Sequence, residues 1–139
     1  MLLFERLKVK SDLNVITDLN GWFAQNCSNY ISRINSSSHS FAHLNLALTE
    51  GFTNAVRHAH HKLPSETAIE IELAIWDERI EIRIWDYGEP FDPNNLVEPM
   101  PGTLCIGGYG WFLLRRLADH VIYERCQDGR NCLLICSSL

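Results

Sequence analysis

Apolar and polar residues alternate with a period of two in several stretches of the chain, which is the pattern of a half-buried β-strand. Residues 2–10 alternate loosely, and we expect an opening strand at a sheet edge. Residues 69–75 and 80–84 carry isoleucine or leucine at nearly every second position, and the polar turn 77–79 joins them. Alternation on both sides of a short turn predicts an antiparallel hairpin with one buried face.

A second hairpin is predicted further along the chain. Residues 121–126 and 131–136 flank Asp128-Gly129, which is a strong signal for a tight turn. Between the two hairpins, residues 89–108 show no regular pattern and are interrupted by prolines and glycines. An irregular segment of this length inside a compact domain is often functional, for example as a lid over a site.

Apolar residues recur at helical spacing in three other stretches. Residues 13–27 predict a helix that Ser11-Asp12 would cap at its N-terminus. A second helix extends to about residue 60, and a third covers residues 111–120. The N-cap of the second helix is expected in or beside a polar loop, at one of three serines: Ser37, Ser38 or Ser40.

The second helix carries two polar side chains that could have a functional role. Glu50 and Asn54 lie four residues apart, so both fall on one helix face, off the apolar stripe. Gly51 and Asn54 are poor mid-helix choices for stability alone, which suggests a close approach at the glycine and a use for the amide. An amide oxygen suits Mg²⁺, which takes few protein ligands beside phosphates and waters. The alternative is that Glu50 and Asn54 occupy a solvated helix face.

Asp86 continues the inward-facing positions of the first hairpin. A carboxylate on a buried strand face is costly unless a donor reaches it, and a purine amino group would be a fitting donor. The alternative is an aspartate that caps a tight turn with Gly88. Before the third helix, Gly108 and Gly110 would let backbone amides approach a phosphate, although turn chemistry also explains such a pair.

The composition fits one domain spanning residues 1–139, with 46% hydrophobic residues and a formal net charge of −5. No basic face is present, so we do not expect direct nucleic-acid binding. No apolar run reaches membrane-spanning length, and the first residues lack the features of a signal peptide. We therefore expect a cytoplasmic protein without membrane association.

Neither the cysteines nor the histidines predict a metal site. The five cysteines contain no C-x-x-C pair, which argues against zinc and against a disulfide framework. Cys132 and Cys136 share the parity of a strand and are expected in the core. The second helix ends in four groups that would complement its dipole: Arg57, His58, His60 and His61. Metal binding by these histidines is the alternative, but no nearby carboxylate or cysteine completes a site.

Three motifs follow one another in a fixed order. E-x-x-x-N-A-x-x-H-A starts at Glu50 on the second helix, D-x-G-x-x-F starts at Asp86 after a strand, and G-x-G starts at Gly108 before the third helix. In order and context these motifs resemble the N-box and the two glycine boxes of the GHKL ATP-binding superfamily, which includes gyrase, histidine kinases and MutL. The chain looks most similar to the anti-sigma-factor serine/threonine kinases of the RsbW type.

This resemblance implies an α+β fold, namely a two-layer α/β sandwich of the Bergerat or histidine-kinase-like ATPase type. Its mixed, mostly antiparallel sheet would be covered on one face by helices, and its cofactors would be ATP and Mg²⁺. Glu50 would be the general base for a substrate hydroxyl, Asn54 the Mg²⁺ ligand and Asp86 the acceptor of the adenine amino group. Further nucleotide contacts would come from within or beside the motifs: Arg57, His58, Gly88, Phe91, Gly108, Tyr109 and Gly110.

The resemblance also implies protein partners. The substrate would be an anti-sigma-factor antagonist of the STAS type, phosphorylated on serine or threonine. The protein would hold a sigma factor until the unphosphorylated antagonist captures the kinase. A homodimer through the N-terminal edge strand or the adjoining helix is expected, because an unpaired strand edge invites pairing.

One departure from the family lies in the irregular segment. Family kinases often carry an arginine two residues before the second G-x-G, where this chain has Ile106, and no lysine or arginine lies between Asp92 and Gly110. Arg57 or Arg115 would have to serve instead. One alternative is a non-catalytic nucleotide-binding module that sequesters a partner without phosphorylating it. Another is a detached histidine-kinase-like domain, which the missing dimerisation hairpin disfavours.

Overall fold

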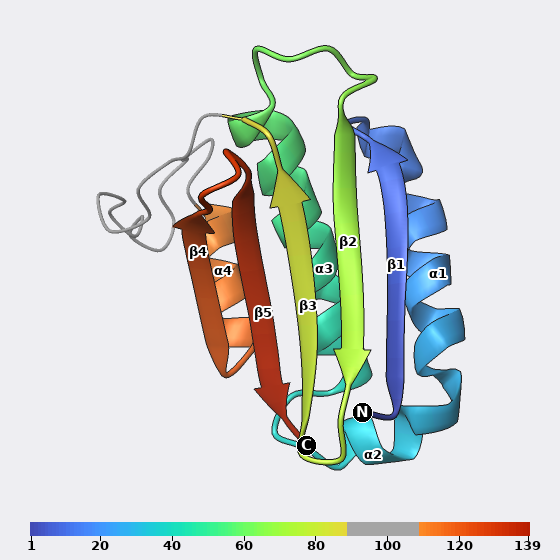
Figure 1. Cartoon of the computed structure of the whole chain (residues 1–139). Helices are drawn as coiled ribbons and strands as arrows, with labels where there is room; N and C mark the ends of the chain where they lie inside the picture. Colours follow the sequence, from blue (N-terminus) through green and yellow to red (C-terminus); the bar gives the residue numbers. More distant parts are fainter. Residues whose placement is uncertain (89–108) are drawn as a thin grey trace.

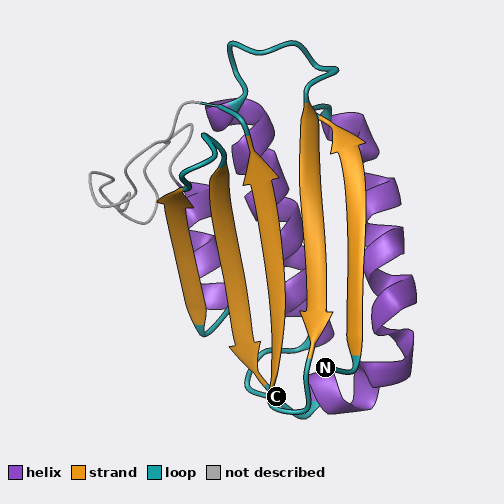
Figure 2. Cartoon of the chain, viewed as in Figure 1, coloured by secondary structure: helices purple, strands orange, loops and turns teal. Residues whose placement is uncertain are grey.

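The computed structural model describes residues 1–88 and 109–139. One five-stranded sheet carries the helices on a single face, so the molecule has two layers (Figures 1 and 2). A π turn, Ala55–Ala59, continues α3. No helix in the described part of the chain is long and apolar enough to cross a bilayer. The main elements, in chain order, are β1 (Leu3–Lys10), α1 (Ile16–Cys27), α2 (Ile31–Asn35), α3 (Phe41–Asn54), β2 (Ala68–Ile75), β3 (Arg79–Asp86), α4 (Tyr109–Leu117), β4 (His120–Arg125) and β5 (Asn131–Ser138).

The strands lie in the order β1-β2-β3-β5-β4, and all four pairings are antiparallel. Both predicted hairpins are present, as β2–β3 and β4–β5, and the opening strand β1 lies at an edge of the sheet beside β2. The predicted two-layer α+β fold is therefore confirmed. The parallel pairing that a mixed sheet would contain is not found among the described strands.

The helix-facing side of the sheet forms the core. Strand β3 buries Ile80, Ile82 and Ile84 on this side, as the alternation predicted. The ring of Phe23 in α1 stacks on the ring of Phe41 in α3, with 5.3 Å between the centroids. Helix α3 covers the sheet with an apolar stripe: Leu44, Leu48, Phe52 and, in the π turn, Ala55. Full burial of one such large side chain contributes about 1.5–3 kcal/mol, so this contact between layers is the main source of stability.

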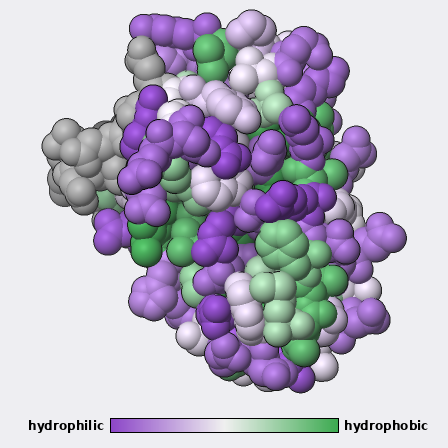
Figure 3. Space-filling view, viewed as in Figure 1, coloured by the Kyte–Doolittle hydropathy of each residue, from purple (hydrophilic) through white to green (hydrophobic). Residues whose placement is uncertain are grey.

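The opposite side of the sheet is not covered by any described helix and is mostly hydrophilic (Figure 3). Its charged side chains pair with one another, for example Arg83 with Glu81 at 2.9 Å. Cys132 and Cys136 also lie on this side, because Leu133 between them on β5 points toward α3. Cys132 is buried and Cys136 half-buried, so neither cysteine lies in the helix–sheet core where it was expected.

The helix boundaries refine the prediction. Ser40 is the N-cap of α3, and its side chain accepts the N–H of His43 at 3.3 Å. The short helix α2 was not predicted, since five residues are too few for a periodic signal. Helix α4 begins at Tyr109 and ends at Leu117, earlier at both ends than the sequence suggested.

Candidate functional site

Helix α3 is held close to the sheet at Gly51. A Cβ atom built on this glycine would lie 2.7 Å from Cδ1 of Ile84 and 2.9 Å from Cδ2 of Leu133. A side chain at this position would require the ends of the Ile84 and Leu133 side chains to move. The close approach that Gly51 suggested is therefore to the sheet itself. It sets how far the neighbouring Glu50 and Asn54 stand from β3.

Beyond Asn54 the helix changes its hydrogen bonding. In the π turn, the N–H of His60 donates to the carbonyl oxygen of Ala55 at 2.8 Å, five residues back. This wider turn inserts one residue into the helical repeat, so His60 faces inward and is only 2% exposed. The sequence grouped His60 with Arg57, His58 and His61 at the helix end, but the π turn separates its buried side chain from those three exposed ones.

The end of β3 meets the π turn backbone to backbone. A Cβ atom built on Gly88 would lie 1.7 Å from the carbonyl oxygen of Ala59, so no side chain fits there. Beside this contact, the N–H of Tyr87 donates to Nε2 of His60 at 2.8 Å. Gly88 is thus required for contact with the helix end. The role expected of it toward an adenine base stays a prediction.

A polar row runs across three neighbouring strands at this end of the sheet. Asp86 of β3 stands opposite Asn131 of β5, which stands opposite Arg125 of β4. Nδ2 of Asn131 donates to Oδ1 of Asp86 at 2.7 Å and to the carbonyl oxygen of Gly88 at 2.8 Å. Arg125 donates to the same carbonyl oxygen at 3.3 Å. The row fixes the carboxylate and the backbone just after it.

The carboxylate of Asp86 is 2% exposed, as the inward parity of β3 predicted. Burial raises its pKa above the usual aspartate value, while hydrogen bonds from Asn131, the Gly88 amide and Tyr123 oppose the shift. A carboxylate offers about four acceptor positions. Three protein donors therefore leave capacity for one further donor, which is what recognition of a purine amino group requires.

The side chain of Asn54 also fits an external partner. Its Nδ2 atom is buried and has no hydrogen-bond partner among the described residues. Glu50, one turn earlier, is half-buried. No group of three or more histidine, cysteine, aspartate or glutamate side chains in the described residues could hold a metal ion. A magnesium ion at Asn54 would therefore take its other ligands from phosphates and waters, as Mg²⁺ usually does in proteins.

The remaining predicted site residues lie on several segments. Arg57 and His58 are exposed on the π turn. Tyr109 and Gly110 are the first residues of α4, which packs against α3. Two further predicted residues, Phe91 and Gly108, lie outside the described residues, as does Ile106. The structure thus brings together α3, the end of β3 and the start of α4.

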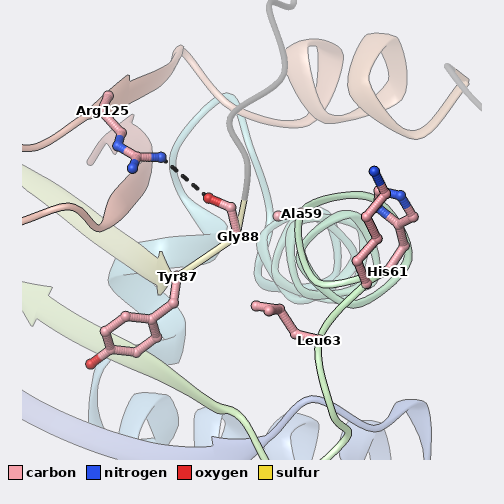
Figure 4. A pocket seen from close by; sticks show the side chains of 7 residues that line it. Ala59, His61, Leu63, Tyr87, Gly88 and Arg125 are labelled. Carbon is pink, nitrogen blue, oxygen red and sulfur yellow. Dashed lines mark hydrogen bonds between the residues drawn. The ribbon is translucent and has the colours of Figure 1, made fainter.

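A pocket of about 200 Å³ opens beside the contact between Gly88 and Ala59. Figure 4 shows Gly88 between Arg125, which reaches its carbonyl oxygen, and Ala59 of the π turn. Lys62 also lines the pocket, so two cations stand beside the end of β3. One of these two cations, Arg125, was not predicted from the sequence to lie near the site.

Sequence reasoning missed three residues here: His60, Asn131 and Arg125. The last two were assigned to a hairpin, but only the pairing of β3 with β5 places them beside Asp86. One signal was available, since Asn131 shares the inward parity of Leu133 and is a polar residue on an apolar face.

Comparisons with known proteins agree with this geometry. The model of the histidine kinase-like ATPase domain family matches residues 22–137. The chain belongs to this family. The resemblance carried by the three motifs is thereby confirmed.

Within the histidine kinase-like ATPase family, the chain is similar to proteins named serine-protein kinase RsbW. It is 37% identical to the protein of Oceanobacillus iheyensis, 36% to that of Staphylococcus epidermidis and 32% to that of Listeria monocytogenes, each over 103 residues. Each match covers 68% of this chain and 64% of the relative. The chain thus spans somewhat less than two thirds of these relatives.

The fold is also similar to that in the crystal structure of the RsbU and RsbW domains of Rv1364c from Mycobacterium tuberculosis. The TM-score is 0.62, over 96% of this chain and 32% of that chain. With 14% sequence identity, this likeness concerns the fold alone. It agrees with the two-layer arrangement described above.

Proposed function

We propose that this histidine kinase-like ATPase domain is an ATP-dependent protein serine/threonine kinase that also acts as an anti-sigma regulatory factor. The observation that carries the proposal is the buried carboxylate of Asp86, held by Asn131 at the end of the sheet where the helix of Glu50 and Asn54 ends. Similarity to proteins named serine-protein kinase RsbW supports the type of substrate.

Nucleotide binding would use three elements. Asp86 would accept the adenine amino group with its remaining acceptor position, and Asn54 would contribute its amide oxygen to Mg²⁺. The first residues of α4, including Gly110, would turn backbone N–H groups toward the phosphates, because the first turn of a helix has unpaired amides. When bound, Mg²⁺-ATP supplies the phosphoryl group, and the metal neutralises charge on the phosphates.

Phosphate transfer would depend on Glu50. Glu50 lies one turn from Asn54 on the same helix, and we propose that its carboxylate would orient a serine or threonine hydroxyl and accept its proton. The proposed substrate is an anti-sigma-factor antagonist of the STAS type. The protein would act as a partner switch, because it would hold a sigma factor as long as the antagonist is in its phosphorylated form.

The test is transfer of label from γ-labelled ATP to a purified STAS-type antagonist. Glu50→Gln should abolish transfer and leave Mg²⁺-ATP binding within about threefold of wild type, because the amide keeps the shape of the side chain but cannot accept the proton. Glu66→Gln, which changes an exposed glutamate in the loop before β2, is the matched control and should transfer normally. Unchanged transfer in Glu50→Gln would remove Glu50 as the base.

A second candidate function is a non-catalytic module that binds nucleotide and sequesters a partner. The observation that favours it is Ile106 in place of a basic residue. Label on the antagonist would exclude this candidate. An acid-stable phosphoserine or phosphothreonine would also exclude a detached histidine kinase, whose product is acid-labile.

We include a homodimer through β1 in the proposal. Among the described strands, β1 pairs only with β2, and its Phe4 is 41% exposed. An edge strand with exposed apolar side chains favours pairing with a second chain. Light scattering on the eluting peak of a sizing column should give twice the mass of one chain, and a monomer mass at micromolar concentration would refute the dimer.

A further inference from the structure

His60 joins the two segments that form the candidate nucleotide site. It stands at the end of the π turn that continues the helix of Asn54, and its Nε2 accepts the N–H of Tyr87 at 2.8 Å. Tyr87 is the residue between Asp86 and Gly88. One side chain therefore ties the helix to the strand end that would receive the base.

This hydrogen bond fixes the protonation state of the imidazole. Because Nε2 accepts, it carries no proton, and the neutral ring must hold its proton on Nδ1. Nδ1 of His60 is buried and has no hydrogen-bond partner among the described residues. An unpaired buried N–H is unfavourable, so packing alone does not account for a histidine at this position. What the ring supplies is an acceptor for the backbone N–H of Tyr87, in a hydrogen bond that is partly buried.

We propose that His60 is a positioning residue of the nucleotide site, whose neutral imidazole holds Asp86 and Gly88 in place relative to Asn54. The inference rests on the proposed nucleotide binding and adds to it a residue that touches neither base nor phosphate. His60 acts through the backbone of Tyr87. Beside that bond, Gly88 contacts Ala59 with no side chain between them. The hydrogen bond is therefore the part of this contact that a change in the protonation of His60 would break.

The surroundings of the ring favour the neutral form. Burial lowers the pKa of His60, and the nearby carboxylate of Asp86 opposes the shift only in part. The charged and titratable groups of the adjoining segments begin with Asp86 and Tyr87 at the end of β3. Strand β4 adds Tyr123, which bonds Asp86, and Arg125 beyond Gly88 (Figure 4). The segment of His60 itself carries four exposed groups: Arg57, His58, His61 and Lys62. Protonation would place a donor opposite the N–H of Tyr87. The hydrogen bond between Tyr87 and His60 should therefore break as the pH falls below the ordinary pKa of histidine.

The experiment is calorimetry of Mg²⁺-ATP binding between about pH 5 and about pH 8, a window that extends well below the ordinary pKa of histidine. His60→Gln keeps an acceptor oxygen that does not titrate, whereas His60→Leu has no acceptor. His43→Gln is the control, because it changes an exposed histidine in the first turn of α3. Titration of the nucleotide itself affects wild type and His60→Gln equally, so it cancels in the ratio of their dissociation constants.

At about pH 8 we expect His60→Gln to bind within about threefold of wild type and His60→Leu at least about tenfold more weakly, because the part-buried N–H of Tyr87 loses its acceptor and the strand end loses its link to the π turn. As the pH falls, the affinity of wild type should weaken relative to His60→Gln, and His43→Gln should follow wild type. In the absence of nucleotide, the amide proton of Tyr87 should exchange slowly in wild type and His60→Gln and rapidly in His60→Leu.

Two results would overturn the inference alone: a ratio of dissociation constants that does not change with pH, or wild-type affinity in a folded His60→Leu. In both cases wild type still binds nucleotide, so the proposed function stands. Absence of binding by wild type at every pH would overturn the proposed function and this inference with it. Should His60→Leu fail to fold, the pH dependence of the ratio decides the matter.

Discussion

Two glycines lie at close contacts between the sheet and helix α3 with its π turn, and the two contacts are built differently. At Gly51, the atoms that a Cβ would meet are the ends of the Ile84 and Leu133 side chains, at 2.7 and 2.9 Å. At Gly88, the atom is the backbone oxygen of Ala59, at 1.7 Å. Side-chain ends can change rotamer, whereas a carbonyl within a hydrogen-bonded turn cannot move without the turn. The first contact can adjust and the second cannot.

The difference matches the chemistry at each place. Gly51 lies over the apolar centre of the sheet, where close packing provides stability. Gly88 lies beside the polar row, where Asn131 bonds both Asp86 and the Gly88 carbonyl. Directional hydrogen bonds tolerate little displacement. The apolar contact therefore stabilises the fold, and the polar contact defines the geometry of the site.

Gly88→Ala tests the rigid contact and should have the largest effect. The new Cβ cannot fit unless the end of β3 separates from the π turn, so we expect the free energy of unfolding to fall by about 3 kcal/mol or more. Urea denaturation measures this change. A loss below about 1 kcal/mol would show that the π turn yields, and the distinction between the two contacts would fail.

Asp86→Asn tests the chemistry of the polar contact. Asparagine still accepts from Asn131 but places an NH₂ group where a purine amino group would donate, so Mg²⁺-ATP affinity should fall at least about tenfold, equivalent to about 1.4 kcal/mol. Calorimetry on both proteins, with and without Mg²⁺, gives the measurement. Equal affinity in the two proteins would show that Asp86 does not recognise the base.

The same variant predicts a pH dependence of stability. Because burial raises the pKa of Asp86, the folded protein takes up a proton before the unfolded chain does as the pH falls. Wild type should therefore lose stability relative to Asp86→Asn as the pH rises through the folded pKa, and regain it on acidification toward the ordinary aspartate value. Thermal unfolding across this range measures the difference. A difference that grows on acidification would contradict the direction of the shift.

Gly51→Ala tests the adjustable contact and should cost about 1 kcal/mol net. Overpacking costs about 1–3 kcal/mol, and the gain in helix propensity offsets about 1 kcal/mol of that. Combining it with Ile84→Val removes the nearer of the two crowding atoms. The double variant should be more stable than the sum of the two single effects predicts. Strict additivity in urea denaturation would mean that Ile84 does not crowd this position.

Gly21→Ala provides the reference and should have the smallest effect. This exposed glycine lies in α1, and a Cβ built on it meets nothing within 4 Å. Alanine should raise the free energy of unfolding by about 0.5–1 kcal/mol through helix propensity alone. If this variant lost as much stability as Gly51→Ala, contact with the sheet would not be what separates the three glycines.

Much of the fold was predictable because its signals are local. The alternation through Ile80, Ile82 and Ile84 gives both the strand and its buried side, and the same parity identifies Asp86 as inward-facing. The order of the strands has no such local signal. The insertion of β5 between β3 and β4 depends on pairing between residues 79–86 and 131–138, far apart in the sequence.

The residues of the candidate site divide in the same way, into those with a local sequence signal and those without one. Glu50 and Asn54 could be paired from helix spacing, and Asp86 from its charge on an apolar face. His60 could not be found, because the π turn breaks the regular period that the pattern assumes. Asn131 and Arg125 required the strand order, which only the whole sheet provides.

The position of β5 between β3 and β4 also has a consequence for biosynthesis. Residues 1–88 leave the ribosome well before residues 131–138, so during this interval β3 has an open edge of unpaired backbone groups and an isoleucine-rich face. Such an edge is prone to pair with other nascent chains. The carboxylate of Asp86 also has no partner on β5 until Asn131 has been synthesised. A nascent chain interrupted before residue 131 would therefore combine an aggregation-prone strand with an unformed binding site.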